Sequence, residues 1–131
     1  MSQLNMIVLD GEYSLCRLPA GSSLPTWVST SAFYNISHTS HELSVVCESK
    51  YVPETIQQDA NWKLLKIAAV LDLSLTGITA KFSTALANAG VNLCVIATFD
   101  TDYIIVKSIK LPTAIAALEK AGFIFETSNN Y

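Results

Sequence analysis

The second half of the chain has the clearer pattern of apolar and polar positions. Two runs rich in β-branched and aromatic residues, 91–99 and 103–106, flank the short polar segment Asp100-Thr101-Asp102. This pattern predicts a strand, a tight turn and a second strand. Aspartate side chains accept hydrogen bonds from nearby backbone amides and so favour turns, which gives both carboxylates a structural explanation. The functional alternative is that one of them faces a small cationic ligand.

Helical periodicity appears on both sides of this predicted hairpin. Before it, apolar residues recur at three- and four-residue spacing and predict one buried helical face, made of Ile78, Phe82, Ala85, Leu86 and Ala89. After it, a second helix is predicted over residues 111–121, with Pro112 early and Gly122 just past its end. With strands predicted at 64–71 and 123–127, the order is β-α-β-β-α-β, the ferredoxin-like arrangement.

The first half contains weaker versions of the same elements. Short strands are predicted at residues 6–9, 13–18, 33–37 and 43–47, and a short helix is predicted within 24–31. Asp10-Gly11 is a hairpin signal. The polar stretch 50–61 is interpreted as the connection between the two halves.

The two halves also resemble each other. Residues 36–46 can be aligned with residues 96–106 at an offset of 60, which places Glu42 over Asp102. We therefore expect an α+β fold, an α/β sandwich, with a degenerate half over residues 1–60 and a complete ferredoxin-like half over residues 61–131.

Composition narrows the class of protein. The chain has 131 residues, half of them hydrophobic, and a net charge of −3. Its eight basic residues are scattered, which disfavours nucleic-acid binding. No apolar run approaches the roughly 20 residues of a membrane helix, and the first residues do not look like a signal peptide. Three cysteines without a CxxC pair, Cys16, Cys47 and Cys94, are expected to be buried thiols in a cytoplasmic protein.

One cluster has the composition of an enzyme or metal site. It consists of His38, His41 and Glu42. On a strand, three-residue spacing sends the two imidazoles to opposite faces, and no third ligand is evident, so we expect solvated turn residues and no bound metal or cofactor. A hydrolase using Cys47 and His41 remains an alternative, although no known catalytic signature is present.

The segment between the strand ending near residue 71 and the following helix is more informative. A helix beginning near Thr76 leaves backbone N–H groups that attract a carboxylate. Ser74 and Thr76 can cap the helix or bind a ligand, and Gly77 allows close approach. The structural alternative is an ordinary helix cap.

These two segments together carry a resemblance to a known family. The run from Leu71 to Val106, with T-G-I at the helix start and A-T-F-D-T-D at the hairpin, resembles the ACT-domain family of small regulatory modules that bind amino acids. It is most similar to the ACT-like domains of the animal cytosolic arginine sensor and of uncharacterised bacterial relatives. In those proteins a degenerate ACT-like half is paired with a complete one.

The resemblance implies a set of ligand-binding residues. Carried over from the sensor, they are Gly77, Ile78, Thr98, Phe99 and Asp102. The sensor has an acidic residue where this chain has Leu75, so a ligand cation loses that partner and the identity of the ligand stays open. We expect a non-catalytic regulatory module that binds a small molecule such as an amino acid and forms a homodimer. The alternative is a structural or protein-interaction module without a ligand.

Overall fold

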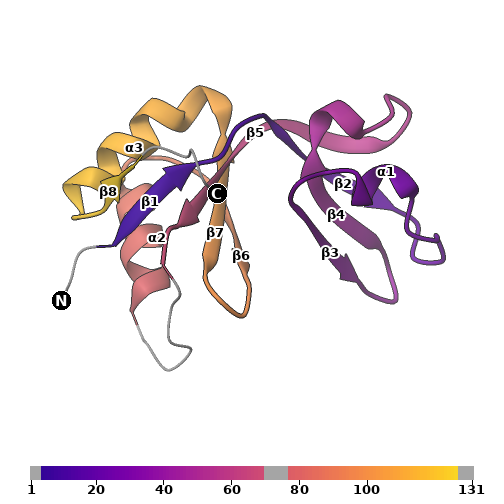
Figure 1. Ribbon diagram of the computed structural model, residues 1–131, viewed down its shortest axis with the longest axis horizontal. Helices are drawn as coiled ribbons and strands as arrows, with labels where there is room; N and C mark the ends of the chain where they lie inside the picture. The colour runs from indigo at the N-terminus through magenta and orange to yellow at the C-terminus, as the bar shows by residue number, and fades with distance from the viewer. Residues whose placement is uncertain (1–3, 70–76, 127–131) are drawn as a thin grey trace. The chain divides into compact units, whose positions relative to one another are not determined.

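The computed structural model describes residues 4–69 and 77–126 (Figure 1). The chain forms two compact units. The insert unit is Gly11–Trp62, and the main unit combines Met1–Asp10 with Lys63–Tyr131. We had expected residues 1–60 to form one half. The structure instead assigns the first ten residues to the main unit, because β1 (Asn5–Val8) pairs with β5 (Gln57–Ile67) and β8 (Ile124–Phe125).

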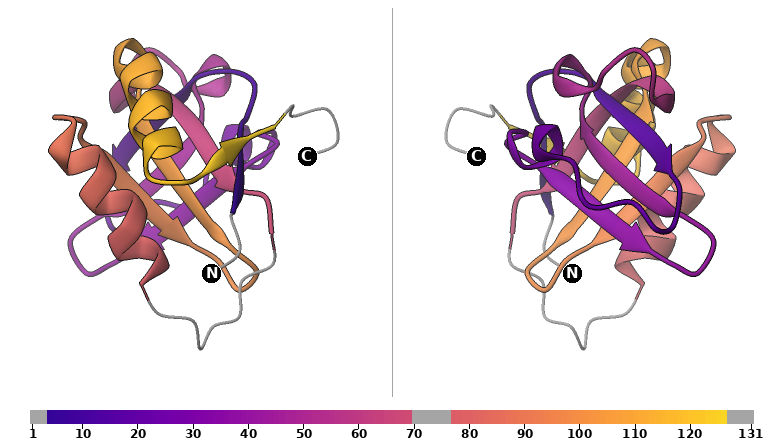
Figure 2. Two further views of the ribbon diagram at one scale, coloured as in Figure 1. Left: turned by 90° about the vertical axis from the view of Figure 1, so that its left-hand side faces the viewer. Right: turned by 90° about the vertical axis from the view of Figure 1, so that its right-hand side faces the viewer.

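The main unit has the predicted ferredoxin-like order of elements. After β5 come α2 (Ile78–Asn88), β6 (Leu93–Ala97), β7 (Asp102–Lys107), the 3-10 turn η2 (Ser108–Lys110), α3 (Leu111–Lys120) and β8. Its sheet has the order β6-β7-β5-β1-β8. Strand β1 is an addition to the β-α-β-β-α-β pattern, antiparallel to β5 and parallel to β8. The helices α2 and α3 lie side by side over one face of this sheet (Figure 2).

The core of the main unit lies between these helices and the sheet. The predicted helical face is confirmed, since Ile78, Phe82 and Leu86 of α2 are buried. They pack with Ala114 and Leu118 of α3 and with apolar residues of the sheet, which are Met6, Leu65, Ile67, Ile104 and Val106. Burial of a side chain of this size contributes about 1.5–3 kcal/mol.

The insert unit is a smaller version of the same plan. It contains β2 (Tyr13–Leu18), the one-turn helix α1 (Thr26–Ser29), β3 (Tyr34–His38), β4 (Leu43–Glu48), the 3-10 turn η1 (Ser49–Tyr51) and the first part of β5. Its strand order is β3-β4-β2-β5. The second helix of the pattern is reduced to η1. No helix in the described parts of the chain is long and apolar enough to cross a membrane.

The repeat between the units is real, but our predicted register was wrong by one residue. Strand β4 begins at Leu43 and β7 begins 59 positions later, at Asp102. The turns agree at the same offset, because Thr39 N–H donates to the Glu42 carbonyl at 2.9 Å and Thr98 N–H donates to the Thr101 carbonyl at 2.9 Å. Leu43 therefore corresponds to Asp102, and Glu42 to Thr101. A shift of one residue moves every side chain to the other face of a strand, and similar apolar runs constrain the register weakly.

Two local predictions were also wrong. Strand β5 begins at Gln57, within the stretch that we interpreted as a connection, because alternate residues there are exposed while the backbone pairs with β2. The Asp10-Gly11 signal does not form a hairpin, because β1 and β2 each pair with β5 and not with each other. Gly11 still supports a turn, with a φ of 84°.

Candidate functional site

Glycine 77 forms the start of α2. Its φ of 88° and ψ of −9° lie in the left-handed region, which glycine adopts without steric cost. Without a side chain, Gly77 cannot cap the helix, and the first intrahelical bond that follows runs from Lys81 N–H to the Gly77 carbonyl at 2.9 Å. The helix thus begins at Ile78, two residues later than we predicted. The N–H groups of its first turn carry partial positive charge and are available to an anion.

Aspartate 102 lies close to this helix end. It is the first residue of β7, opposite Ala97 of β6. Its side chain points to the helix side of the sheet, because Ile104 and Val106, two and four residues further, lie in the core under the helices. The Thr79 hydroxyl donates to Asp102 Oδ2 across 3.4 Å. This contact joins the two segments that we expected to form one site.

Threonine 98 and Phe99 have different roles in the structure. The Thr98 hydroxyl donates to the Thr101 carbonyl at 2.9 Å and accepts from Thr101 N–H at 3.2 Å, so it closes the hairpin turn. Thr39 accepts the corresponding bond, from Glu42 N–H, in the insert unit. Phe99 follows at the hairpin tip, with 81% of the residue's surface exposed. Thr98 therefore has a structural task, and Phe99 is the member of this pair that is open to a ligand.

Two threonines were missed by the sequence analysis. Thr79 was treated only as a helical residue, and Thr101 only as part of the turn. Thr101 is buried, and its hydroxyl donates to the Ile67 carbonyl at 2.9 Å, which fixes the hairpin to the end of β5. A threonine between two aspartates carries no distinctive signal, because its buried partner is a backbone atom 34 positions away in the sequence.

Part of the expected site lies outside the described residues. Ser74 and Thr76 belong to the stretch 70–76, as does Leu75. Around Gly77, an added Cβ would meet no described atom within 4 Å. Of the expected site, the structure places Asp102 against Thr79, which directly follows Gly77 and Ile78 in the chain.

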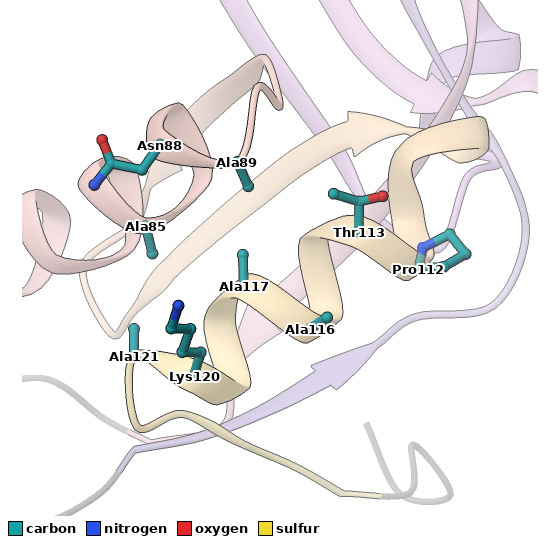
Figure 3. Close-up of a pocket in the computed structure, with 9 residues that line it drawn as sticks. All are labelled: Ala85, Asn88, Ala89, Pro112, Thr113, Ala116, Ala117, Lys120 and Ala121. Carbon is teal, nitrogen blue, oxygen red and sulfur yellow. The ribbon is translucent and has the colours of Figure 1, made fainter.

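The main unit also has a groove, which lies elsewhere. It has a volume of about 740 Å³ and runs between α2 and α3 (Figure 3). Its lining is mostly alanine: Ala85, Ala89, Ala116, Ala117 and Ala121, with Asn88, Pro112, Thr113 and Lys120. None of the expected ligand-binding residues contributes to it. With one charged side chain and no carboxylate, this groove does not match the two opposite charges of an amino acid.

His38, His41 and Cys47 are among the residues that we considered for metal binding or catalysis. His38 Nε2 lies 2.9 Å from the Ala20 carbonyl oxygen, and His41 is exposed. Within residues 4–69 and 77–126, no group of three histidine, cysteine or acidic side chains is arranged to hold a metal ion. Cys47 is fully buried, and a hydrogen bond with Cys16 together with burial raises the pKa of its thiol, which weakens it as a nucleophile. Cys94 was expected to be buried but is partly exposed.

Family comparison agrees with the geometry of the main unit. A family model described as an ACT domain matches residues 57–120, from the start of β5 to the end of α3. These residues are an ACT domain. A second family model, described as an N-terminal domain, matches residues 11–55, which fall within the insert unit. None of the curated proteins matches the sequence closely enough to count as a relative.

Solved structures extend the likeness to the whole chain. A crystal structure of an Agobacterium tumefaciens protein shares 28% identity and a TM-score of 0.91, over 98% of this chain and 96% of that one. A Vibrio cholerae protein of unknown function, described as a possible transport protein, shares 23% identity and a TM-score of 0.75, over 92% and 91% of the two chains. The regulatory subunit of aspartate kinase from Thermus thermophilus has a similar fold, with 14% identity and a TM-score of 0.59, over 84% of this chain and 91% of that one.

Proposed function

We propose that this chain is a non-catalytic regulatory module of the cytoplasm that binds a free amino acid at the start of α2. The observation that carries the proposal is the contact of Thr79 with Asp102, which places a carboxylate against the first turn of α2. A free amino acid carries an ammonium and a carboxylate on one carbon, so it matches both groups. Regulatory binding of amino acids is the common role of ACT domains.

Each expected residue within the described part of the chain has a role in this proposal. Asp102 pairs with the ammonium of the amino acid, and the N–H groups of Gly77 and Ile78 bind its carboxylate. Bonds assisted by charge in this way are worth roughly 1.5–3 kcal/mol each. Thr98 holds the hairpin, and Phe99 covers the bound side chain.

A thermal-shift panel of the twenty L-amino acids and the common nucleotides, each at millimolar concentration, tests the function. An amino acid at a hundred times its dissociation constant stabilises the folded state by about 2.7 kcal/mol. For a chain of 131 residues this raises the melting temperature by roughly 10 °C. A panel in which no amino acid raises the melting temperature contradicts the proposal.

We further propose that the chain is a homodimer with the ligand site at or near the boundary between two copies. Two features support this. Phe99 is exposed beside the site, and β6 is an edge strand of five apolar residues that carries no charge to discourage pairing. Light scattering should give twice the chain mass of 14.2 kDa, and the binding amino acid should tighten the dimer. A measured mass of 14.2 kDa at micromolar protein concentration, which is the mass of one chain, contradicts the proposed homodimer.

The second candidate function is a protein-interaction module without a ligand. The alanine-lined groove between α2 and α3 favours it, since small side chains let another helix approach closely. This candidate predicts a flat thermal-shift panel. It also predicts loss of partner binding when Ala117 is replaced by a bulky residue.

A further inference from the structure

We propose that Thr79 is a further ligand-binding residue of the amino-acid site, which orients the Asp102 carboxylate and shares the ligand's ammonium with it. This inference rests on the proposed function and extends it to a residue outside the ligand-binding set implied by the family resemblance.

The geometry separates the two oxygens of Asp102. Thr79 Oγ1 reaches Oδ2 across 3.4 Å, which leaves Oδ1 for another donor. Thr79 is exposed and Asp102 is partly exposed, so a solute can reach both. A hydroxyl that donates its proton still has lone pairs that accept hydrogen bonds. An ammonium placed next to the pair can therefore donate one N–H to Oδ1 and a second to Thr79 Oγ1.

The distance of 3.4 Å is long for a hydroxyl–carboxylate bond, which is usually 2.5–3.0 Å. Polar contacts of a site without its ligand are often long and shorten when the ligand binds. Thr79 lies in the first turn of α2, and Asp102 lies at the start of β7. When the ammonium binds, it draws the Thr79 hydroxyl and the Asp102 carboxylate closer together, although the two groups belong to different elements.

The insert unit shows that this arrangement is not a requirement of the hairpin. The corresponding hairpin keeps the turn-closing threonine, Thr39. At the position of Asp102 it has Leu43, which is buried, and at the position of Thr101 it has Glu42. The fold thus forms the same turn without the carboxylate. The polar contact from α2 to β7 is a feature of the main unit alone, as expected if one half of the repeat keeps a binding site.

Two substitutions of Thr79 and one matched control test the inference. Thr79→Val removes the hydroxyl and keeps the branched shape, whereas Thr79→Ser keeps the hydroxyl. Thr84→Val makes the same change at an exposed position of the same helix. We titrate each variant by calorimetry, both alone and combined with Asp102→Asn. The ligand is the amino acid that raises the parent's melting temperature most in the thermal-shift panel of the twenty L-amino acids. The melting temperature of each variant is recorded to show that it folds.

The expected result is a loss of affinity of about three- to tenfold for Thr79→Val, the range that one hydrogen bond supports. Thr79→Ser and Thr84→Val should stay within about twofold of the parent. In the Asp102→Asn background, Thr79→Val should lose clearly less affinity than in the parent, because the two residues act together.

Three results overturn the inference while the proposed function stands: Thr79→Val binds as well as the parent, Thr79→Ser loses as much affinity as Thr79→Val, or the losses at Thr79 and Asp102 simply add. If the parent binds none of the twenty amino acids, the proposed function fails and this inference fails with it.

Discussion

The hydroxyl of Thr79 and a carboxylate oxygen of Asp102 lie 3.4 Å apart, although the residues are 23 positions apart in the sequence. One belongs to the first turn of α2 and the other begins β7. The contact fixes the position of a negative charge next to a helix end that favours negative ligands. A ligand that carries both charged groups on one carbon is therefore better matched to this site than a simple anion or cation.

Replacing Asp102 by asparagine should weaken amino-acid binding tenfold or more, because the amide keeps the size of the side chain but cannot pair with an ammonium. The melting temperature should change little, since Asp102 is partly exposed. The matched control is Asp100→Asn, an exposed carboxylate in the same turn, which should bind like the parent. If Asp102→Asn also binds like the parent in calorimetry, Asp102 is only a turn residue.

Replacing Gly77 by alanine should reduce both stability and binding. At a φ of 88°, an L-residue is strained by about 1–2 kcal/mol, and relief of that strain moves the first turn of α2. Gly90→Ala is the control, because Gly90 follows the other end of the same helix with a φ of 74°. Both variants should unfold at lower urea concentration, and only Gly77→Ala should lose affinity. Equal affinities of the two variants would argue against contact of the ligand with the helix start.

Asparagine 61 should be the most sensitive exposed position of β5. Its φ of 69° lies in the left-handed region, next to an irregularity in the pairing of β5 with β2. Asn61→Gly should be nearly neutral, whereas Asn61→Val should cost about 1–2 kcal/mol in urea unfolding. Gln57→Val, an exposed position of the same strand, serves as control and should change stability by less than about 0.5 kcal/mol. Equal costs for the two valine variants would show that the backbone at Asn61 is not strained.

Sequence periodicity was sufficient to predict α2 and the β6–β7 hairpin of the main unit, but not the place of β1 in its sheet. The spacing of Ile78, Phe82 and Leu86 and the apolar runs around Asp100 correctly predicted α2 and the β6–β7 hairpin, because those patterns depend on neighbours in the sequence. The place of β1 depends on pairing with strands far along the chain, so no local pattern signals it.

The candidate site was predicted in outline for the same reason. Gly77 and Asp102 belong to local motifs that resemble those of a known family, and the structure brings their segments together. Thr79 and Thr101 act through partners 23 and 34 positions away, so only the folded chain identifies them. The one-residue error in the repeat arose because alternating apolar residues fit two neighbouring registers almost equally well. The starts of β4 and β7 and the turn bonds of Thr39 and Thr98 distinguish the two registers.

The most direct test of the central claim is an amide ¹H–¹⁵N NMR titration of the intact chain with each of the twenty L-amino acids. We predict that at least one amino acid saturates the protein and shifts the amide signals of Gly77, Ile78, Thr79 and Asp102 more than any others in the described residues. Saturation that shifts signals of Ala85, Ala117 and Ala121 in the groove and leaves those four unchanged would contradict the account, as would the absence of any saturable shift.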